Sequence, residues 1–123
     1  MEKILITTNM YISIPDLYQG KSQTGQDLYD HLLGSLKKIG PVRETKKAMS
    51  ISLENRKAFA SAMIRNRSIK LVLRTTHKIA SARIHSMNRV SAKDFDHTIL
   101  IESKDDIDEE LMSWLADAYQ TSM

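Results

Sequence analysis

The sequence contains no cysteine, only four glycines and two prolines, and no long apolar run. The absence of cysteine excludes disulfides, thiolate nucleophiles and thiolate metal ligands, and makes a reducing cytoplasm the expected location. A membrane span needs about 20 apolar residues and a signal peptide needs an apolar core, so we expect neither of these, and no membrane partner.

The four glycines also restrict the possible chemistry. They form no phosphate-binding loop and no Gly-x-Ser-x-Gly elbow. The histidines lack metalloprotease spacing from one another and from carboxylates; they are His31, His77, His85 and His97. We therefore predict no cofactor and no metal. An enzymatic role stays open, but the sequence favours a protein without catalytic function.

The composition is typical of a soluble globular domain. The chain has 123 residues, of which 41% are hydrophobic and 27% are charged. A chain of this length buries roughly two thirds of the surface that its unfolded form exposes, which is enough for one core. We therefore predict a single domain over residues 1–123, in which residues 1–20 form a loosely ordered lead or include a short edge strand at Met1 to Thr8. Tyr11 to Gly20 predicts a turn, or one helical turn that starts at Pro15.

A β-hairpin is predicted at the centre of the sheet, from Lys57 to Thr75. Two runs that alternate apolar and polar residues flank a polar break at Arg65-Asn66-Arg67-Ser68. Because side chains alternate along a strand, the second run has an apolar face and a cationic face. These faces consist of Ile69, Leu71 and Leu73, and of Lys70, Val72 and Arg74.

Two helices are expected to cover the apolar face. The first spans about Gly25 to Ile39, with a capping-box pattern at Thr24 and Asp27 and a stop at Gly40-Pro41. Gly34 inside it would mark a close approach to the sheet. The second helix spans about Asp106 to Tyr119, and Ser103 with Asp106 forms a second capping-box pattern. The acidic residues that follow favour the positive end of a helix dipole.

Further strands complete the predicted sheet. From Val42 the pattern alternates, and we expect three apolar residues to share the buried face: Met49, Ile51 and Leu53. Glu54-Asn55-Arg56 predicts a turn, Thr75 to Ser81 a loop, and Ala82 to Val90 one or two short strands. Phe95 to Glu102 predicts a central strand, with apolar residues on both faces. The fold class is therefore α+β, with an antiparallel sheet of about four to six strands and two long helices on one face.

Charge is strongly segregated along the chain, whose net charge is +3. Residues 37–93 contain fifteen Lys or Arg against two acids, a net charge of +13, whereas residues 94–123 contain nine acids against one lysine, a net charge of −8. Two interpretations remain open. The basic segment is either a surface for an anionic partner or is neutralised by the acidic end of the same chain.

One pattern is compatible with a metal-dependent nuclease. An apolar strand ends in Glu102-Ser103-Lys104, and such enzymes place a carboxylate and a lysine at a strand end. Their second carboxylate comes from a neighbouring strand, whereas Asp94 and Asp96 belong to this strand or its entry. A strand exit followed by a helix cap accounts for the same residues.

Nucleic acid is a second possible partner, on charge alone. Aromatic stacking platforms are scarce, since Phe59 is the only aromatic residue in the basic segment. Binding would therefore go to phosphate and would depend strongly on salt.

Several short pieces follow one another between Leu28 and Tyr119, over about three quarters of the chain. The pieces are Leu28-Tyr29-Asp30-His31-Leu32-Leu33 before Gly40-Pro41-Val42, Thr45-Lys46-Lys47, Arg56 to Ala60, Phe95-Asp96-His97, and Asp105 to Leu111 followed by Trp114-Leu115 and Ala118-Tyr119. In their order and spacing they resemble a bacterial family known as domain of unknown function number fifty-six fifty-five. The resemblance implies a small α+β domain, often appended to larger bacterial proteins, with no established activity. Some relatives carry a cysteine-containing N-terminal segment that this chain lacks, so no metal role transfers. A shared site would include Lys46, Arg56, Phe59 and His97. Without the resemblance, the same residues are expected to be strand-face charges, a core aromatic residue and a buried histidine.

Three functional hypotheses follow. The first is a non-catalytic binding module whose basic sheet surface receives an anionic ligand or a protein partner. Its candidate residues are Lys46, Arg56, Phe59, Arg67, Lys70, Arg74 and His97. The second is a nucleic-acid-associated or nuclease-like protein that acts through Glu102 and Lys104. The third is a homodimer in which the basic segment of one copy pairs with the acidic last helix of another.

Overall fold

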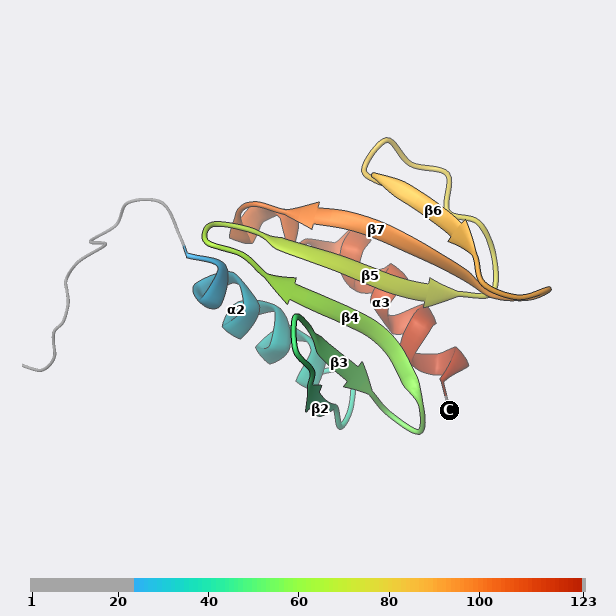
Figure 1. Cartoon of the computed structure of the whole chain (residues 1–123), viewed down its shortest axis with the longest axis horizontal. Coiled ribbons are helices and arrows are strands. Elements are labelled where there is room, and N and C mark those ends of the chain that lie inside the picture. Colours follow the sequence, from blue (N-terminus) through green and yellow to red (C-terminus); the bar gives the residue numbers. More distant parts are fainter. Residues whose placement is uncertain (1–23, 123) are drawn as a thin grey trace, which may run out of the picture.

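A six-stranded antiparallel sheet, with strand order β2-β3-β4-β5-β7-β6, dominates the computed structural model, which describes residues 24–122 (Figure 1). Two helices lie behind the sheet in Figure 1 and pack against its central strands. The predicted α+β class, sheet and helix arrangement are confirmed. The elements are α2 (Gly25–Lys37), β2 (Arg43–Lys46), β3 (Ile51–Glu54), β4 (Ala58–Ile64), β5 (Ile69–Thr75), β6 (Ser86–Arg89), β7 (Phe95–Ile101), the 3-10 turn η1 (Lys104–Asp106) and α3 (Glu109–Thr121). The predictions for Met1 to Thr8 and Tyr11 to Gly20 lie outside the described residues.

The central hairpin forms as its alternating pattern predicts. Strands β4 and β5 pair with Ile64 opposite Ile69, and the N–H of Arg65 donates to the carbonyl of Ser68 at 2.8 Å to close the turn. The apolar face of β5 is fully buried under the helices, while the opposite face has no helix over it within residues 24–122. We call this second surface the open face of the sheet.

Helix α2 begins at the predicted capping box. The hydroxyl of Thr24 accepts from the N–H of Asp27 at 3.1 Å, and the Asp27 carboxylate accepts from the N–H of Thr24 at 3.3 Å. The expectation for Gly34 was wrong, because a Cβ there would meet no atom outside the helix backbone within 4 Å. The close approach occurs instead at Gly25, whose N–H donates to the Asn66 carbonyl at 2.8 Å.

The second helix begins later than its sequence predicts. Ile107 departs from helical geometry, with φ −92° and ψ 73°, and buries its side chain. The polypeptide therefore makes a separate 3-10 turn before α3. Asp106 accepts from the N–H groups of Glu102 and Ser103 at the start of this turn, whereas α3 is capped by Asp108, which accepts from the N–H of Leu111 at 3.0 Å. Neither helix within residues 24–122 has the length and apolar character needed to cross a membrane.

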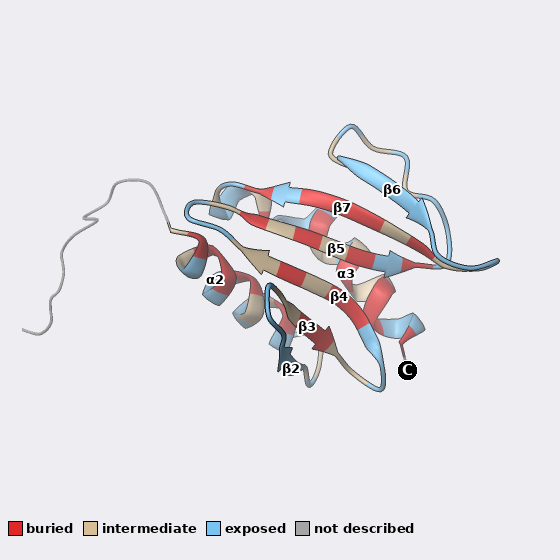
Figure 2. Cartoon of the chain, in the orientation of Figure 1, coloured by how far each residue is buried: buried red, intermediate tan, exposed pale blue. Residues whose placement is uncertain are grey.

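The prediction that Met49 is buried was wrong. Strand β2 ends at Lys46, and a turn closed by the Lys47 N–H and the Ser50 carbonyl at 2.8 Å interrupts the alternation. Met49 lies in this turn and is 74% exposed, whereas Leu53 is fully buried as predicted. Figure 2 shows the two edge strands, β2 and β6, exposed along their length.

A β-bulge turns an aromatic ring into the core. Leu53 lies opposite Ala60 and Glu54 lies opposite Ala58, which leaves Phe59 as the extra residue of β4. An extra residue in one strand redirects the side chains next to it. Phe59 is 1% exposed and meets the ring of Tyr119 edge-on, with 5.4 Å between ring centroids.

Candidate anion-binding surface

A row of short side chains crosses the open face of the sheet. The strand register aligns Thr45, Ser52, Ser61, Val72, Thr98 and Ser86. Five of these six residues carry a hydroxyl group. Because the side chains are short, the middle of the open face is lower than the longer side chains around it.

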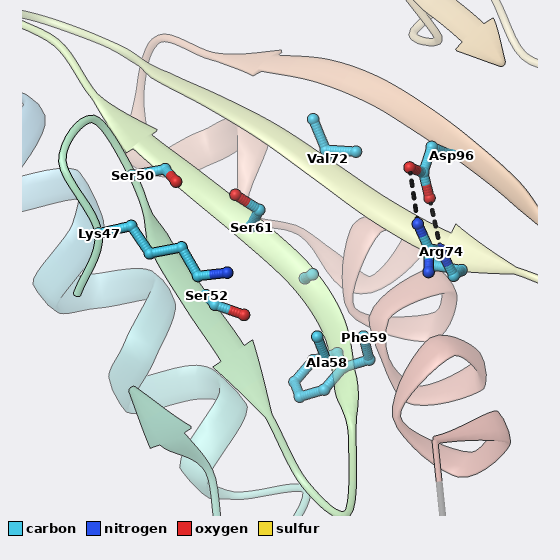
Figure 3. Close-up of a pocket in the computed structure, with 10 residues that line it drawn as sticks. Lys47, Ser50, Ser52, Ala58, Phe59, Ser61, Val72, Arg74 and Asp96 are labelled. Carbon is cyan, nitrogen blue, oxygen red and sulfur yellow. Dashed lines mark hydrogen bonds and ion pairs between the residues drawn. The ribbon is translucent and has the colours of Figure 1, made fainter. Parts of the chain in front are cut away.

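Part of this row lines a hollow of about 160 Å³, whose apolar lining consists of Ala58, Phe59, Ala60 and Val72. Its polar lining consists of three serines, a lysine and an ion pair: Ser50, Ser52, Ser61, Lys47, Arg74 and Asp96. Figure 3 shows Lys47 extending from the turn before β3 toward Ser52, with Arg74 and Asp96 at the other end. The hollow therefore combines hydroxyl groups with a net charge of +1. We refer to it below as the serine hollow.

Arg74 contributes hydrogen-bond donors more than charge. Its Nε and Nη2 atoms donate to the two carboxylate oxygens of Asp96 at 2.8 and 3.1 Å. These hydrogen bonds raise the pKa of Arg74 above its ordinary value. A guanidinium group has five N–H donors, so about three remain for a ligand after this pairing. Asp96 holds Arg74 in place and cancels its charge.

Other arginines of the basic segment are also paired within the chain. Arg43 binds Glu54 at 2.7 Å, and Arg83 binds Asp108 and Glu110 at 2.9 and 3.0 Å. The hydrogen bond from Arg43, followed by one from Ser52, holds the pKa of Glu54 below its usual value. The acidic end of the chain thus neutralises part of the basic segment.

Four cations near the serine hollow have no ion-pair partner among the described residues: Lys46, Lys47, Arg65 and Lys70. Lys47 lines the hollow itself. Lys70 projects from the open face of β5, opposite Met63. All four lie at the end of the sheet that carries the turn between β2 and β3 and the turn between β4 and β5.

The structure brings only two of the seven predicted site residues, Phe59 and Arg74, to one place. Arg56 and Arg67 lie in the turns at opposite ends of β4, roughly 20 Å apart along the strand. Lys46 lies opposite Ile51 on the edge strand. Of the seven candidates, Arg74 and Phe59 line the serine hollow. Phe59 and His97 are buried on the helix side of the sheet.

The residues that sequence reasoning missed as site residues are Lys47, Ser50, Ser52 and Ser61. The alternation around β3 did indicate that Ser50 and Ser52 share a face opposite Ile51. No local signal places Lys47 over them, because its position depends on the turn that ends β2.

The pieces proposed for a nuclease site are separated. Asp96 and Glu102 lie at opposite ends of β7, roughly 20 Å apart. Asp96 binds Arg74, and the N–H of Glu102 binds Asp106. In residues 24–122 no group of three or more His, Asp or Glu side chains is arranged to hold a metal ion.

His97 lies in the core, where its Nε2 atom accepts a hydrogen bond from the N–H of Ile79 at 3.0 Å. Its side chain is 0% exposed, and burial lowers the pKa of His97 below its ordinary value of 6.5. Protonation would remove the acceptor and place a charge in the core. The contact holds the loop before β6 against the sheet.

We expect this histidine to make stability fall in acid. The unfolded chain binds a proton near pH 6.5 while the folded chain resists it, so the unfolding free energy should decline as pH falls below about 6.5, by at most ~1.4 kcal/mol per pH unit for one proton. Urea titrations from about pH 8 to about pH 5 measure this slope. His97→Gln keeps an acceptor for Ile79 and should flatten it. An equally steep slope in that variant would assign the acid sensitivity to other groups.

Comparison with known proteins supports one assignment. A family model described as Domain of unknown function (DUF5655) matches residues 14–122. No protein of curated function matches the chain, and no solved structure matches it. The matched range contains both helices and all six strands described above.

Proposed function

Because the chain belongs to the DUF5655 family, whose description assigns no activity, we propose a function from the chain's own geometry: a non-catalytic module that binds an anionic group on the open face of its sheet. The observation that carries this proposal is the serine hollow. Three serine hydroxyls, the Lys47 ammonium group and the remaining donors of Arg74 surround it. Hydrogen bonds in which one partner is charged are about twice as strong as neutral ones, which favours an anion over a neutral ligand.

The size and charge of the hollow indicate what kind of anionic group it binds. A volume of about 160 Å³ suits one carboxylate or one phosphate group rather than a polyanion. Asp96 opposes a second negative charge, since it cancels Arg74 and leaves Lys47 as the unpaired cation of the lining. A monoanionic group therefore fits the hollow better than a run of phosphates.

The nuclease and self-association hypotheses receive less support from the same structure. The carboxylates needed for a nuclease site are about a strand length apart, as described above. Asp108 and Glu110, which would pair with a second copy, bind Arg83 of their own chain. Anion binding in the serine hollow requires neither a movement of these carboxylates nor the loss of their ion pairs with Arg83.

The test is calorimetric titration with inorganic phosphate and with acetate, at low and near-physiological salt. We expect weak binding that high salt screens, and a loss of about tenfold or more in Lys47→Glu, because a charge-assisted contact is worth about 1.5–3 kcal/mol. Lys38→Glu is the matched control. It makes the same change of charge at the exposed C-terminal end of α2, and α2 packs on the side of the sheet opposite the open face. Equal losses in the two variants would show that net charge alone attracts the anion.

Nucleic acid is the comparison ligand. Fluorescence anisotropy with short single-stranded and duplex probes measures whether a polyanion binds more tightly than phosphate alone. Tight binding that depends steeply on salt and is unaffected by Lys47→Glu would show that nucleic acid binds at a surface other than the serine hollow.

A further inference from the structure

A second, apolar groove adjoins the serine hollow. It has a volume of about 480 Å³ and lies between the turn after β2 and the end of β4. Met49 and Met63 line it together with Ile51 and Ile64, which are half-buried and also pack against the core. Ligand-binding pockets commonly enclose about 300–1,000 Å³ and are lined mainly by apolar residues, and this groove has both properties.

Met49 is exposed at the rim of this groove. It is 74% exposed, more than any other large hydrophobic side chain exposed within residues 24–122. Methionine is unbranched and polarizable, so it adapts to the shape of an apolar partner better than a branched residue does. Met63 contributes a second flexible side chain from the open face of β4.

The rim of the groove is cationic. Lys46, Lys47 and Arg65 line it, and no acidic side chain does so among the described residues. These three cations have no ion-pair partner in the described chain. An apolar surface surrounded by unpaired positive charge is complementary to a molecule that has an apolar body and a negative group.

The two depressions share part of their lining. Lys47 and Ser50 contribute to both the serine hollow and the apolar groove. A ligand whose acidic group is bound in the first can therefore extend its apolar part directly into the second. The shared residues also fix the order of the two parts, with the acid group toward Ser52 and Ser61 and the apolar part toward Met49.

We propose that this surface binds a small amphipathic monoanion of the fatty-acid type, with its acid group in the serine hollow and its chain along Met49 and Met63. The identity of the acid-binding end rests on the function proposed above, whereas the chain-binding end rests on the groove alone. The backbone groups of β3 and β4 in the groove floor are paired with each other, so a peptide cannot add there as a strand. An acyl chain needs no backbone partner.

Calorimetric titration with acetate, hexanoate and decanoate tests the proposal. Each buried methylene contributes about 0.8 kcal/mol, so affinity should rise by up to ~fourfold for each methylene that enters the groove. Met49→Ser combined with Met63→Ser should abolish this rise while leaving acetate and phosphate binding unchanged. Met87→Ser is the matched control, since it changes a methionine that is 37% exposed on the other edge strand.

The outcomes separate the two proposals. Binding of acetate and phosphate without any gain from hexanoate or decanoate overturns the fatty-acid inference and leaves the anion-binding function in place. Decanol that binds as tightly as decanoate overturns the role of the acid group. Failure of every anion to bind overturns both proposals. Displacement of decanoate by an acidic amphipathic peptide that binds more tightly would identify the groove as a protein-docking surface and overturn the small-molecule assignment.

Discussion

Replacement of Phe59 by alanine is expected to lower the unfolding free energy by about 3–5 kcal/mol. Phe59 is 1% exposed, meets Tyr119 edge-on at 5.4 Å, and belongs to the core cluster between the sheet and α3. Truncation would leave a cavity between β4 and the helix and would remove the aromatic contact. Since small domains are stable by about 5–15 kcal/mol, this loss is a large part of the total. Urea denaturation followed by circular dichroism measures it.

The matched control is Val72→Ala. Val72 is half-buried on the open face of β5 and faces away from α3, so its truncation should cost much less than that of Phe59. The comparison also decides between the two roles that the sequence allows for Phe59. A stable Phe59→Ala variant that has lost affinity for phosphate would show that the ring serves the binding surface and not the core.

The parts of the fold that sequence predicts well are those set by local patterns. The alternation of β5 and the polar break at Arg65 to Ser68 predict the central hairpin without any knowledge of its neighbours. The capping box of α2 is likewise a contact between residues three positions apart. Such signals are strong because the interacting groups are close in sequence and the geometry has few alternatives.

The predictions that failed depended on where a turn interrupts a pattern. Met49 continues the apolar alternation of Ile51 and Leu53, yet the turn after Lys46 places it in solvent. Ser103 and Asp106 satisfy the capping pattern, but they cap a short 3-10 turn because Ile107 turns into the core before α3 begins. In both cases tertiary packing chooses between local structures that the sequence makes nearly equivalent.

The candidate site was less predictable than the fold because it depends on pairing between distant residues. Arg74 looks like one of several free cations in the sequence, and only the register of β5 with β7 places Asp96 beside it. Arg83 is likewise neutralised, because it pairs with Asp108 and Glu110 at the start of α3. Segregation of charge along the chain therefore overstates the positive charge of the open face, where Asp96 neutralises Arg74.

We expect Gly25→Ala and Gly34→Ala to have opposite effects on stability, although both replace a glycine in α2. A Cβ at Gly25 would overlap the backbone carbonyl of Arg65, which cannot rotate away as a side chain can. The helix start would have to move from the β4–β5 turn and lose the hydrogen bond from the Gly25 N–H to Asn66, at 2.8 Å. We estimate a loss of about 2–4 kcal/mol for overpacking together with the lost bond. At Gly34 the added methyl group meets nothing within 4 Å, so alanine should stabilise the helix by about 0.5–1 kcal/mol.

Thermal and urea denaturation of both variants distinguish the cause of the Gly25 effect. A general intolerance of α2 to substitution would destabilise the two variants alike, whereas a steric clash affects Gly25→Ala alone. Gly25→Ser should be as harmful as Gly25→Ala, because the clash arises from the Cβ atom and not from polarity. Stability equal to that of the original chain in Gly25→Ala would mean that the start of α2 is free to move away from the Arg65 carbonyl, and that the contact between them contributes little to the fold.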